Sequence, residues 1–123
     1  MNAEKYTQKS LAAVKDAQEL TIRNQNQQIE QVHLLSALLQ QEGGLVPQLL
    51  KKMGVTVESL NAAVNQELSK LPRVTGSGRE ADKFYVSRAV DTALTKAEEI
   101  AAGMKDDFVS VEHLLLALIE CPD

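Results

Sequence analysis

An internal repeat constrains the fold of this 123-residue chain more than any other feature of its sequence. When the sequence is shifted by 80 residues, segment 6–41 aligns with segment 86–121. Five of the eight identical pairs fall in one six-residue motif, His-Leu-Leu-x-Ala-Leu. The period is too long for a solenoid, so the repeat predicts a duplicated unit whose two copies pack together. The identical pairs are Ala13 and Ala93, Ala17 and Ala97, Glu19 and Glu99, His33 and His113, Leu34 and Leu114, Leu35 and Leu115, Ala37 and Ala117, and Leu38 and Leu118.

Apolar residues within the repeat recur at spacings of three and four, which is typical of amphipathic helices. Glycine and proline cluster between these segments and do not show the regular turn spacing of a β-sandwich. Thr7 and Ser110 stand where a hydroxyl group can cap the first turn of a helix. The expected fold class is therefore all-α: a small helical domain of two pseudo-repeated helical units, with about six helices and no strand.

The two copies differ in length. Repeat one spans 6–71 and includes short helices expected near 46–53 and 57–69, a linker follows at 72–83, and partial repeat two spans 84–121. We therefore expect a truncated second unit and a chain that is a fragment of a longer protein. The second unit lacks helices equivalent to those at 46–53 and 57–69, so we expect incomplete cover, and with it self-association or looseness, at this end of the chain. The apolar residues concerned are among Leu114, Leu115, Leu118 and Ile119.

Composition excludes several classes of protein. The net charge of −4 argues against a nucleic-acid-binding protein, which normally presents a basic face. No apolar run approaches the roughly 20 residues that span a bilayer, and no secretory signal is visible. The single Cys121 excludes an internal disulfide and a cysteine zinc cluster. We therefore expect a cytoplasmic domain with neither nucleic acid nor membrane as a partner.

Catalytic chemistry has little support in the sequence. The glycine-rich segment 76–79 lacks the spacing and the lysine of a phosphate-binding loop. His33 and Ser36 lie one helical turn apart, but no third residue that would orient the histidine is evident. Each histidine stands alone on its helix, and Cys121 has no basic neighbour that would activate its thiol. We expect no catalytic site, no metal and no cofactor in this domain; a helical metal or cofactor enzyme is the alternative from another class.

A binding surface is better supported. The acidic pair Asp106-Asp107 joins the last two expected helices and is followed directly by Phe108 and Val109. Acidic residues beside apolar ones at a helix junction predict an apolar surface with a negatively charged rim. Such a surface suits the binding of other proteins.

Several motifs occur in a characteristic order along the chain. The tandem His-Leu-Leu-x-Ala-Leu units, the Glu-Gly-Gly turn at 42–44, the helix end at 49–55 and the Leu-Pro-x-Val-x-Gly-x-Gly linker at 71–78 resemble the N-terminal domain of Clp ATPases, the AAA+ ring chaperones and unfoldases. The resemblance extends from about Tyr6 to Glu120, and within the family it is strongest to the disaggregase branch.

The resemblance implies a substrate-binding module that captures unfolded or aggregated polypeptide for ATP-driven threading by the parent hexamer. ATP and Mg²⁺ would bind in ATPase modules that this chain lacks, and those modules and adaptor proteins are further expected partners. The family's substrate-binding positions match Thr7, Asp106 and Glu112, with Leu94 and His113 at groove-like positions.

Two features depart from the family pattern. Family domains usually complete the second repeat with two more helices, and Glu30-Gln31 replaces a common hydroxyl cap in the first repeat. The alternative within the same fold is an adaptor-docking domain of an unfoldase that works with a protease.

Overall fold

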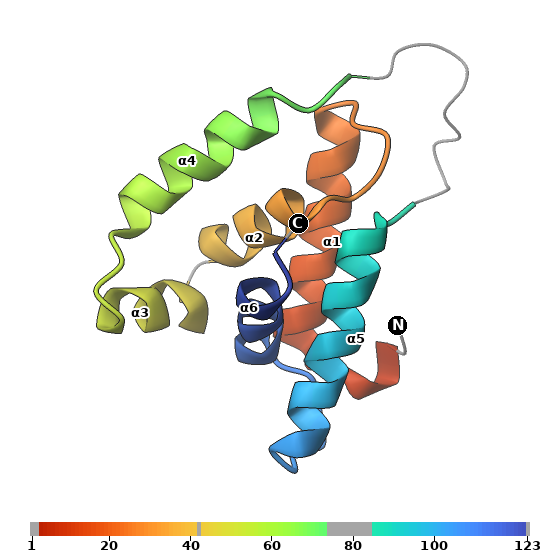
Figure 1. The fold of residues 1–123 in the computed structure, drawn as a ribbon, viewed down its shortest axis with the longest axis vertical. Coiled ribbons are helices and arrows are strands. Elements are labelled where there is room, and N and C mark those ends of the chain that lie inside the picture. Colours follow the sequence, from red (N-terminus) through yellow and green to blue (C-terminus); the bar gives the residue numbers. More distant parts are fainter. Residues whose placement is uncertain (1–2, 42, 74–84, 123) are drawn as a thin grey trace.

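The computed structural model describes residues 3–41, 43–73 and 85–122 and places six α-helices in these ranges. The all-α fold class is confirmed (Figure 1). None of the helices in the described ranges is long and apolar enough to cross a membrane. The helices are α1 (Gln8–Arg23), α2 (Gln31–Gln40), α3 (Leu45–Lys52), α4 (Val57–Ser69), α5 (Arg88–Gly103) and α6 (Val111–Glu120), and a short 3₁₀ turn, η1 (Ala3–Lys5), precedes α1.

The sequence repeat is also a structural repeat. Helices α5 and α6 begin and end 80 residues after α1 and α2. The same kind of cap starts the first helix of each copy: Thr7 Oγ1 accepts the amide of Ser10 at 3.2 Å, and Ser87 Oγ accepts the amide of Val90 at 3.1 Å. These hydroxyl groups satisfy amides that the first helical turn leaves unpaired.

The two copies are joined by reciprocal backbone pairs. Tyr6, just before α1, pairs with Val109 of the second repeat, and Val86, just before α5, pairs with Ile29 of the first. The amides of Val109 and Ile29 each donate a hydrogen bond of 2.7 Å to the other repeat. Val86 is the equivalent of Tyr6, and Val109 is the equivalent of Ile29, so the two pairs are themselves equivalent. Figure 1 shows α1 and α5 running in opposite directions. The copies therefore pack as equivalent halves.

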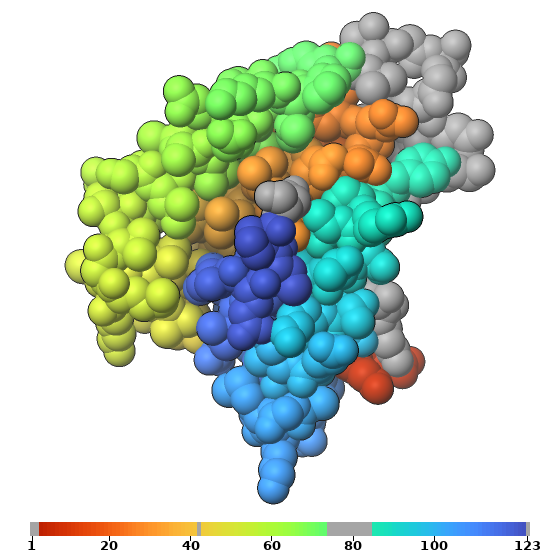
Figure 2. Space-filling view, in the orientation of Figure 1, coloured from red at the N-terminus to blue at the C-terminus, as the bar shows by residue number. Residues whose placement is uncertain are grey.

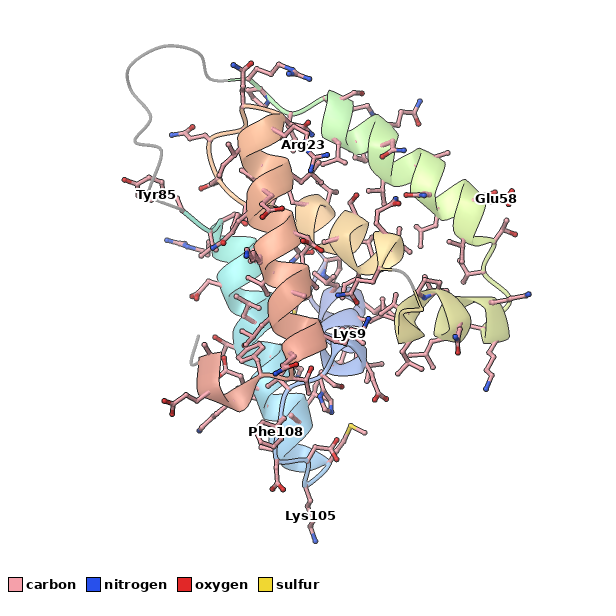
Figure 3. The ribbon with its side chains drawn as sticks, turned by 180° about the vertical axis from the view of Figure 1, so that it is seen from behind. Lys9, Arg23, Glu58, Tyr85, Lys105 and Phe108 are labelled. Atoms are coloured by element: carbon pink, nitrogen blue, oxygen red, sulfur yellow. The ribbon has the colours of Figure 1, made fainter. Side chains whose placement is uncertain are left out.

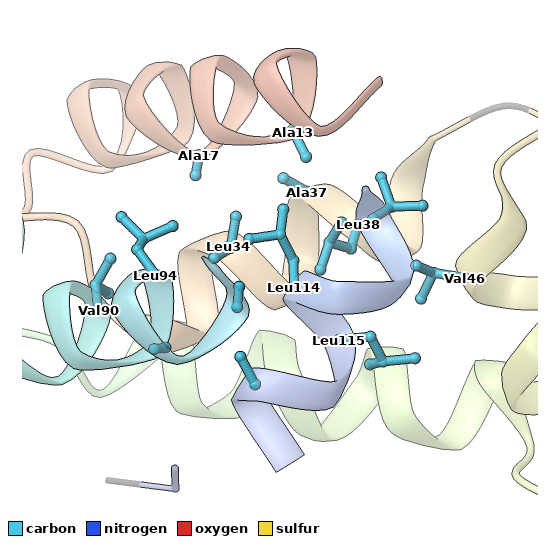
Figure 4. Packing of buried hydrophobic residues seen from close by; sticks show 14 of the residues in the cluster. Ala13, Ala17, Leu34, Ala37, Leu38, Val46, Val90, Leu94, Leu114 and Leu115 are labelled. Atoms are coloured by element: carbon cyan, nitrogen blue, oxygen red, sulfur yellow. The ribbon is translucent and has the colours of Figure 1, made fainter. Parts of the chain in front are cut away.

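One apolar cluster lies where α1, α2, α5 and α6 converge (Figure 4). Leu34, Leu38 and Leu114 are its largest fully buried apolar side chains. Buried alanines such as Ala17 and Ala97 allow the helix backbones to approach closely. The core therefore uses the residues that the two sequence copies share.

Helices α3 and α4 extend the first repeat on one side of this core (Figure 1). Helix α4 packs on α2, and α3 contacts both α2 and α6. The expectation of poor cover on the last helix is wrong for Leu114 and Leu115, which are buried in the central cluster, because α6 packs against α1, α2 and α5 and α3 also contacts it from the first repeat. It holds for Ile119, which is 53% exposed, while Leu118 is half-buried. The expected linker at 72–83 lies, apart from its first two residues, outside the described residues.

Candidate functional site

The loop between α5 and α6, residues 104–110, forms one end of the molecule. Figure 2 shows it as a projecting tip, and Figure 3 places Lys105 and Phe108 there. Lys105 has a left-handed φ of 60°, and the Asp106 amide donates to the Ala101 carbonyl at 2.9 Å to close the turn. The start of α1 lies against the same loop, because the Thr7 amide donates to the Val109 carbonyl at 2.9 Å. Two segments far apart in sequence therefore build this end.

A hollow of about 270 Å³ opens between η1, the C-terminal part of α5 and the α5–α6 loop, and we call it the tip hollow. Three acidic residues and one lysine share its lining with an exposed aromatic ring. The ring of Phe108 is 52% exposed. The hollow thus offers apolar contact within a negatively charged rim. Its lining residues are Lys5, Glu98, Ala101, Ala102, Asp106, Asp107, Phe108 and Val109.

His113 fixes the position of Asp106. The Nδ1 atom of His113 accepts the backbone amide of Ser110 at 2.9 Å, so the neutral ring carries its proton on Nε2. That Nε2–H donates to Asp106 Oδ2 at 2.8 Å. His113 is 3% exposed, whereas the side chain of Asp106 is 46% exposed. A buried, oriented donor therefore holds a carboxylate that faces solvent.

A second buried donor supports the wall of the hollow. The hydroxyl of Tyr6 donates to Glu98 Oε2 at 3.0 Å. Burial, and then the hydrogen bond and the negative charge of Glu98, raise the pKa of Tyr6 well above its ordinary value. Tyr6 therefore stays neutral and keeps the carboxylate of Glu98 at the rim.

The structure brings four of the five predicted site residues to this end of the molecule. Thr7 caps α1, Asp106 lies in the loop, and His113 and the exposed Glu112 belong to the first turn of α6. Leu94 is not among them, because it lies midway along α5 and is 6% exposed within the core. His113 is also buried, so neither Leu94 nor His113 presents a surface to a ligand. Both can act only by positioning the exposed residues that cover them.

Sequence reasoning underestimated the apolar part of the site. Met104 was not among the predicted site residues, because its spacing continues the apolar stripe of α5; however, α5 ends at Gly103 and Met104 is 55% exposed in the turn. The predicted apolar surface grouped Phe108 with Val109, but Val109 is buried. The helix-ending Gly103 was the signal that Met104 would leave the stripe.

The other residues that the sequence analysis considered for catalysis or metal binding are His33, Ser36 and Cys121. His33 Nδ1 accepts the amide of Glu30 at 2.8 Å, and its Nε2 bonds Asn26 Oδ1 at 2.8 Å, so this ring is directed away from Ser36. The described residues contain no cluster of three or more His, Cys, Asp and Glu side chains suited to a metal ion. Cys121 is a half-buried free thiol.

Comparison with known proteins gives a consistent result. The model of the Clp repeat (R) N-terminal domain family matches residues 5–123. The chaperone protein ClpB of Nitratidesulfovibrio vulgaris is 40% identical over 122 residues, which cover 99% of this chain and 14% of that protein. The chain thus spans about 14% of the length of such curated relatives.

Solved structures share the fold. The N-terminal domain of Hsp104 from Candida albicans matches with a TM-score of 0.83 and 27% identity, over 95% of this chain and 75% of that one. The ClpV N-domain solved in complex with a VipB peptide matches with a TM-score of 0.73 and 21% identity, over 95% and 69% of the two chains. The latter likeness concerns the fold alone.

Proposed function

This chain belongs to the Clp repeat N-terminal domain family, and on that premise we propose that it is the substrate-binding module of a ClpB-like, ATP-dependent chaperone. In this role it captures unfolded or aggregated polypeptide, which the parent hexamer then threads using ATP. ATP and Mg²⁺ would act in the ATPase modules of the parent protein, and this domain would contribute binding alone.

The observation that carries the proposal is the exposed apolar surface at the tip hollow. Phe108 lines the hollow together with Asp106 and Asp107 and is more than half exposed. Met104, at the start of the same loop, is also more than half exposed. Apolar burial gives about 25 cal/mol per Å² without directional requirements, so such a surface accepts many different side chains. That tolerance is what a receptor for unfolded chains requires.

The size of the hollow implies weak binding by a single domain. A hollow of about 270 Å³ is smaller than a typical small-molecule pocket and can hold only a few side chains. Six copies on one ring would raise the overall capture through effective concentration, without any additional contact. Modest affinity also allows the client to be released to the ATPase pore.

Titration of the ¹⁵N-labelled chain with a permanently unfolded model protein tests the proposal. We expect amide shifts at Thr7, in residues 104–110 and at Glu112, with α3 and α4 as internal controls that do not move. Replacing Phe108 by Ser should weaken binding without lowering the stability of the domain, because Phe108 is exposed. Unmoved amides at Thr7, Asp106 and Glu112 on saturation would refute this site.

A second function within the family is the docking of a folded partner or adaptor. The structure of a ClpV N-domain with a VipB peptide supports it, because a related fold there binds a defined segment. The two functions predict different competition. A docking domain should bind one defined segment and ignore unrelated unfolded chains, whereas a client-binding domain should let different unfolded chains compete for the tip hollow.

A further inference from the structure

The loops that follow α1 and α5 are equivalent, and each borders a hollow. Three equivalent pairs line both hollows: Asn26 and Asp106, Gln27 and Asp107, and Gln28 and Phe108. The left-handed residues Gln25 and Lys105 give the two loops the same turn. The loop of the first repeat is therefore an internal reference for these three residues of the tip hollow, although the rest of the two linings differs.

In the first repeat, another segment of the chain lies against this loop and bonds Asn26. The segment Leu71-Pro72 follows α4 and lines the hollow, and Asn26 Nδ2 donates to the Pro72 carbonyl at 3.1 Å. Asn26 is only 3% exposed as a result. A short segment with a backbone carbonyl thus satisfies the amide side chain of the loop.

In the second repeat, the equivalent residue has the opposite hydrogen-bonding character. Asp106 can only accept hydrogen bonds when ionised, and His113 already donates to its Oδ2 atom. Its side chain is 46% exposed, whereas Asn26 is covered. A segment lying where Leu71-Pro72 lies in the first repeat would have to donate to Asp106.

The surroundings of Asp106 favour a cationic donor. Asp107 and Glu98 add negative charge at the same hollow, and Lys5 is the one basic residue among the described residues that line it. Phe108 adds an exposed ring face, and aromatic faces attract Lys and Arg side chains. In the first repeat, the equivalents of Asp107 and Phe108 are Gln27 and Gln28, which carry neither a charge nor an aromatic ring.

We propose that the tip hollow binds a short client segment against the α5–α6 loop, as Leu71-Pro72 lies against the equivalent loop, and selects segments whose Lys or Arg side chain donates to Asp106. This inference rests on the proposed function and specifies the class of client that the site prefers. His113 is a positioning residue, because it orients Asp106 without facing the client.

A pair of fluorescein-labelled, unstructured, leucine-rich peptides tests the inference. The two are identical except that one carries a central arginine and the other citrulline, its uncharged analogue. By fluorescence anisotropy at low salt, we expect the unmodified chain to prefer the arginine peptide by about fivefold, the ratio of an exposed ion pair. Asp106→Asn should lower the ratio of the two affinities to about twofold or less, because only the general negative charge of the hollow then remains.

The variant retains a geometry that the molecule already contains, because an asparagine bonds a histidine at the same place in the first repeat. Asp91→Asn is the matched control, because it removes an exposed carboxylate from the opposite end of α5. This position lies about 20 Å from the tip hollow at 1.5 Å per helical residue. The control variant should keep the preference for the arginine peptide. Equal binding of both peptides by the unmodified chain, or a preference that is undiminished in Asp106→Asn, would overturn the inference but not the proposed function. Failure of both peptides and of an unfolded protein to bind would overturn both.

Discussion

At the scale of single residues, His33 and His113 have the same structural role but different hydrogen-bond partners. Each accepts, through Nδ1, the amide that precedes its own helix. His33 Nε2 then bonds the buried Asn26, whereas His113 Nε2 bonds Asp106, which faces solvent. The difference in exposure of the partners determines how costly the loss of each ring would be.

We predict that His33→Ala destabilises the domain more than His113→Ala. Removing His33 leaves buried polar atoms without their partner and opens a cavity, at a cost of about 2–4 kcal/mol. Removing His113 opens a similar cavity, but water can solvate Asp106, so the cost should be about 1–2 kcal/mol. Urea titrations of both variants at pH 7 measure the difference, and a larger loss for His113→Ala would contradict this account.

Tyr6 gives the domain a pH dependence at alkaline pH. Its pKa is raised in the folded state, chiefly by burial and then by Glu98, whereas in the unfolded chain it is about 10. The stabilisation is complete below pH 10 and decreases as pH rises above that value, by about 1.4 kcal/mol per pH unit for one group. The free energy of unfolding of the unmodified chain should therefore fall more steeply above pH 10 than that of Tyr6→Phe, which lacks the phenol group. Parallel curves would show that Tyr6 is not the cause.

The residues of the candidate site were only partly predictable. The acidic pair, Thr7 and Glu112 lie at one end of the fold, as a binding surface requires. The burial of Leu94 follows from the helical stripe to which it belongs, but its place in a groove rested on family resemblance. The bond between His113 and Asp106 depends on ring orientation, which residue spacing does not determine.

At the scale of helices, the sequence predicted the elements well and their pairing poorly. Apolar spacing and caps such as Thr7 located the helices, because both signals are local. The pairs between Tyr6 and Val109 and between Ile29 and Val86 involve isolated residues, which leave no periodic pattern. The packing of α3 on α6, which covers Leu115, is equally invisible to local patterns.

Because α1 and α5 have equivalent caps, Ser87 serves as a control that distinguishes the structural role of Thr7 from a role in binding. Thr7→Ala and Ser87→Ala each remove a hydrogen bond to the first helical turn, so each should cost about 1 kcal/mol of stability. Only Thr7→Ala should also weaken the binding of an unfolded protein, because Ser87 lies at the opposite end of α5 from the tip hollow. Thermal unfolding and anisotropy measure the two effects. If the variants bind equally well, Thr7 is a cap and no more.

At the scale of the whole molecule, the two repeats depend on each other. Each contributes one strand-like residue before its first helix and one before its second, and all four pair across the repeats. The central leucines come from both copies, with Leu34 and Leu38 from α2 and Leu114 from α6. Neither half can therefore bury its apolar face or complete its backbone pairs alone.

This interdependence predicts that the described helical core unfolds as one cooperative unit. Native-state hydrogen exchange in low denaturant should give the same opening free energy for the slowest amides of α1 and α2 as for those of α5 and α6. Leu38→Ala, a change in the first repeat, should lower both values equally, by about 2–4 kcal/mol. Helix α4 is the internal contrast, because it packs mainly on α2 and should open at lower free energy. If the opening free energy of α5 and α6 is unchanged in Leu38→Ala, the second repeat folds independently of the first. The reciprocal backbone pairs would then not couple the two halves.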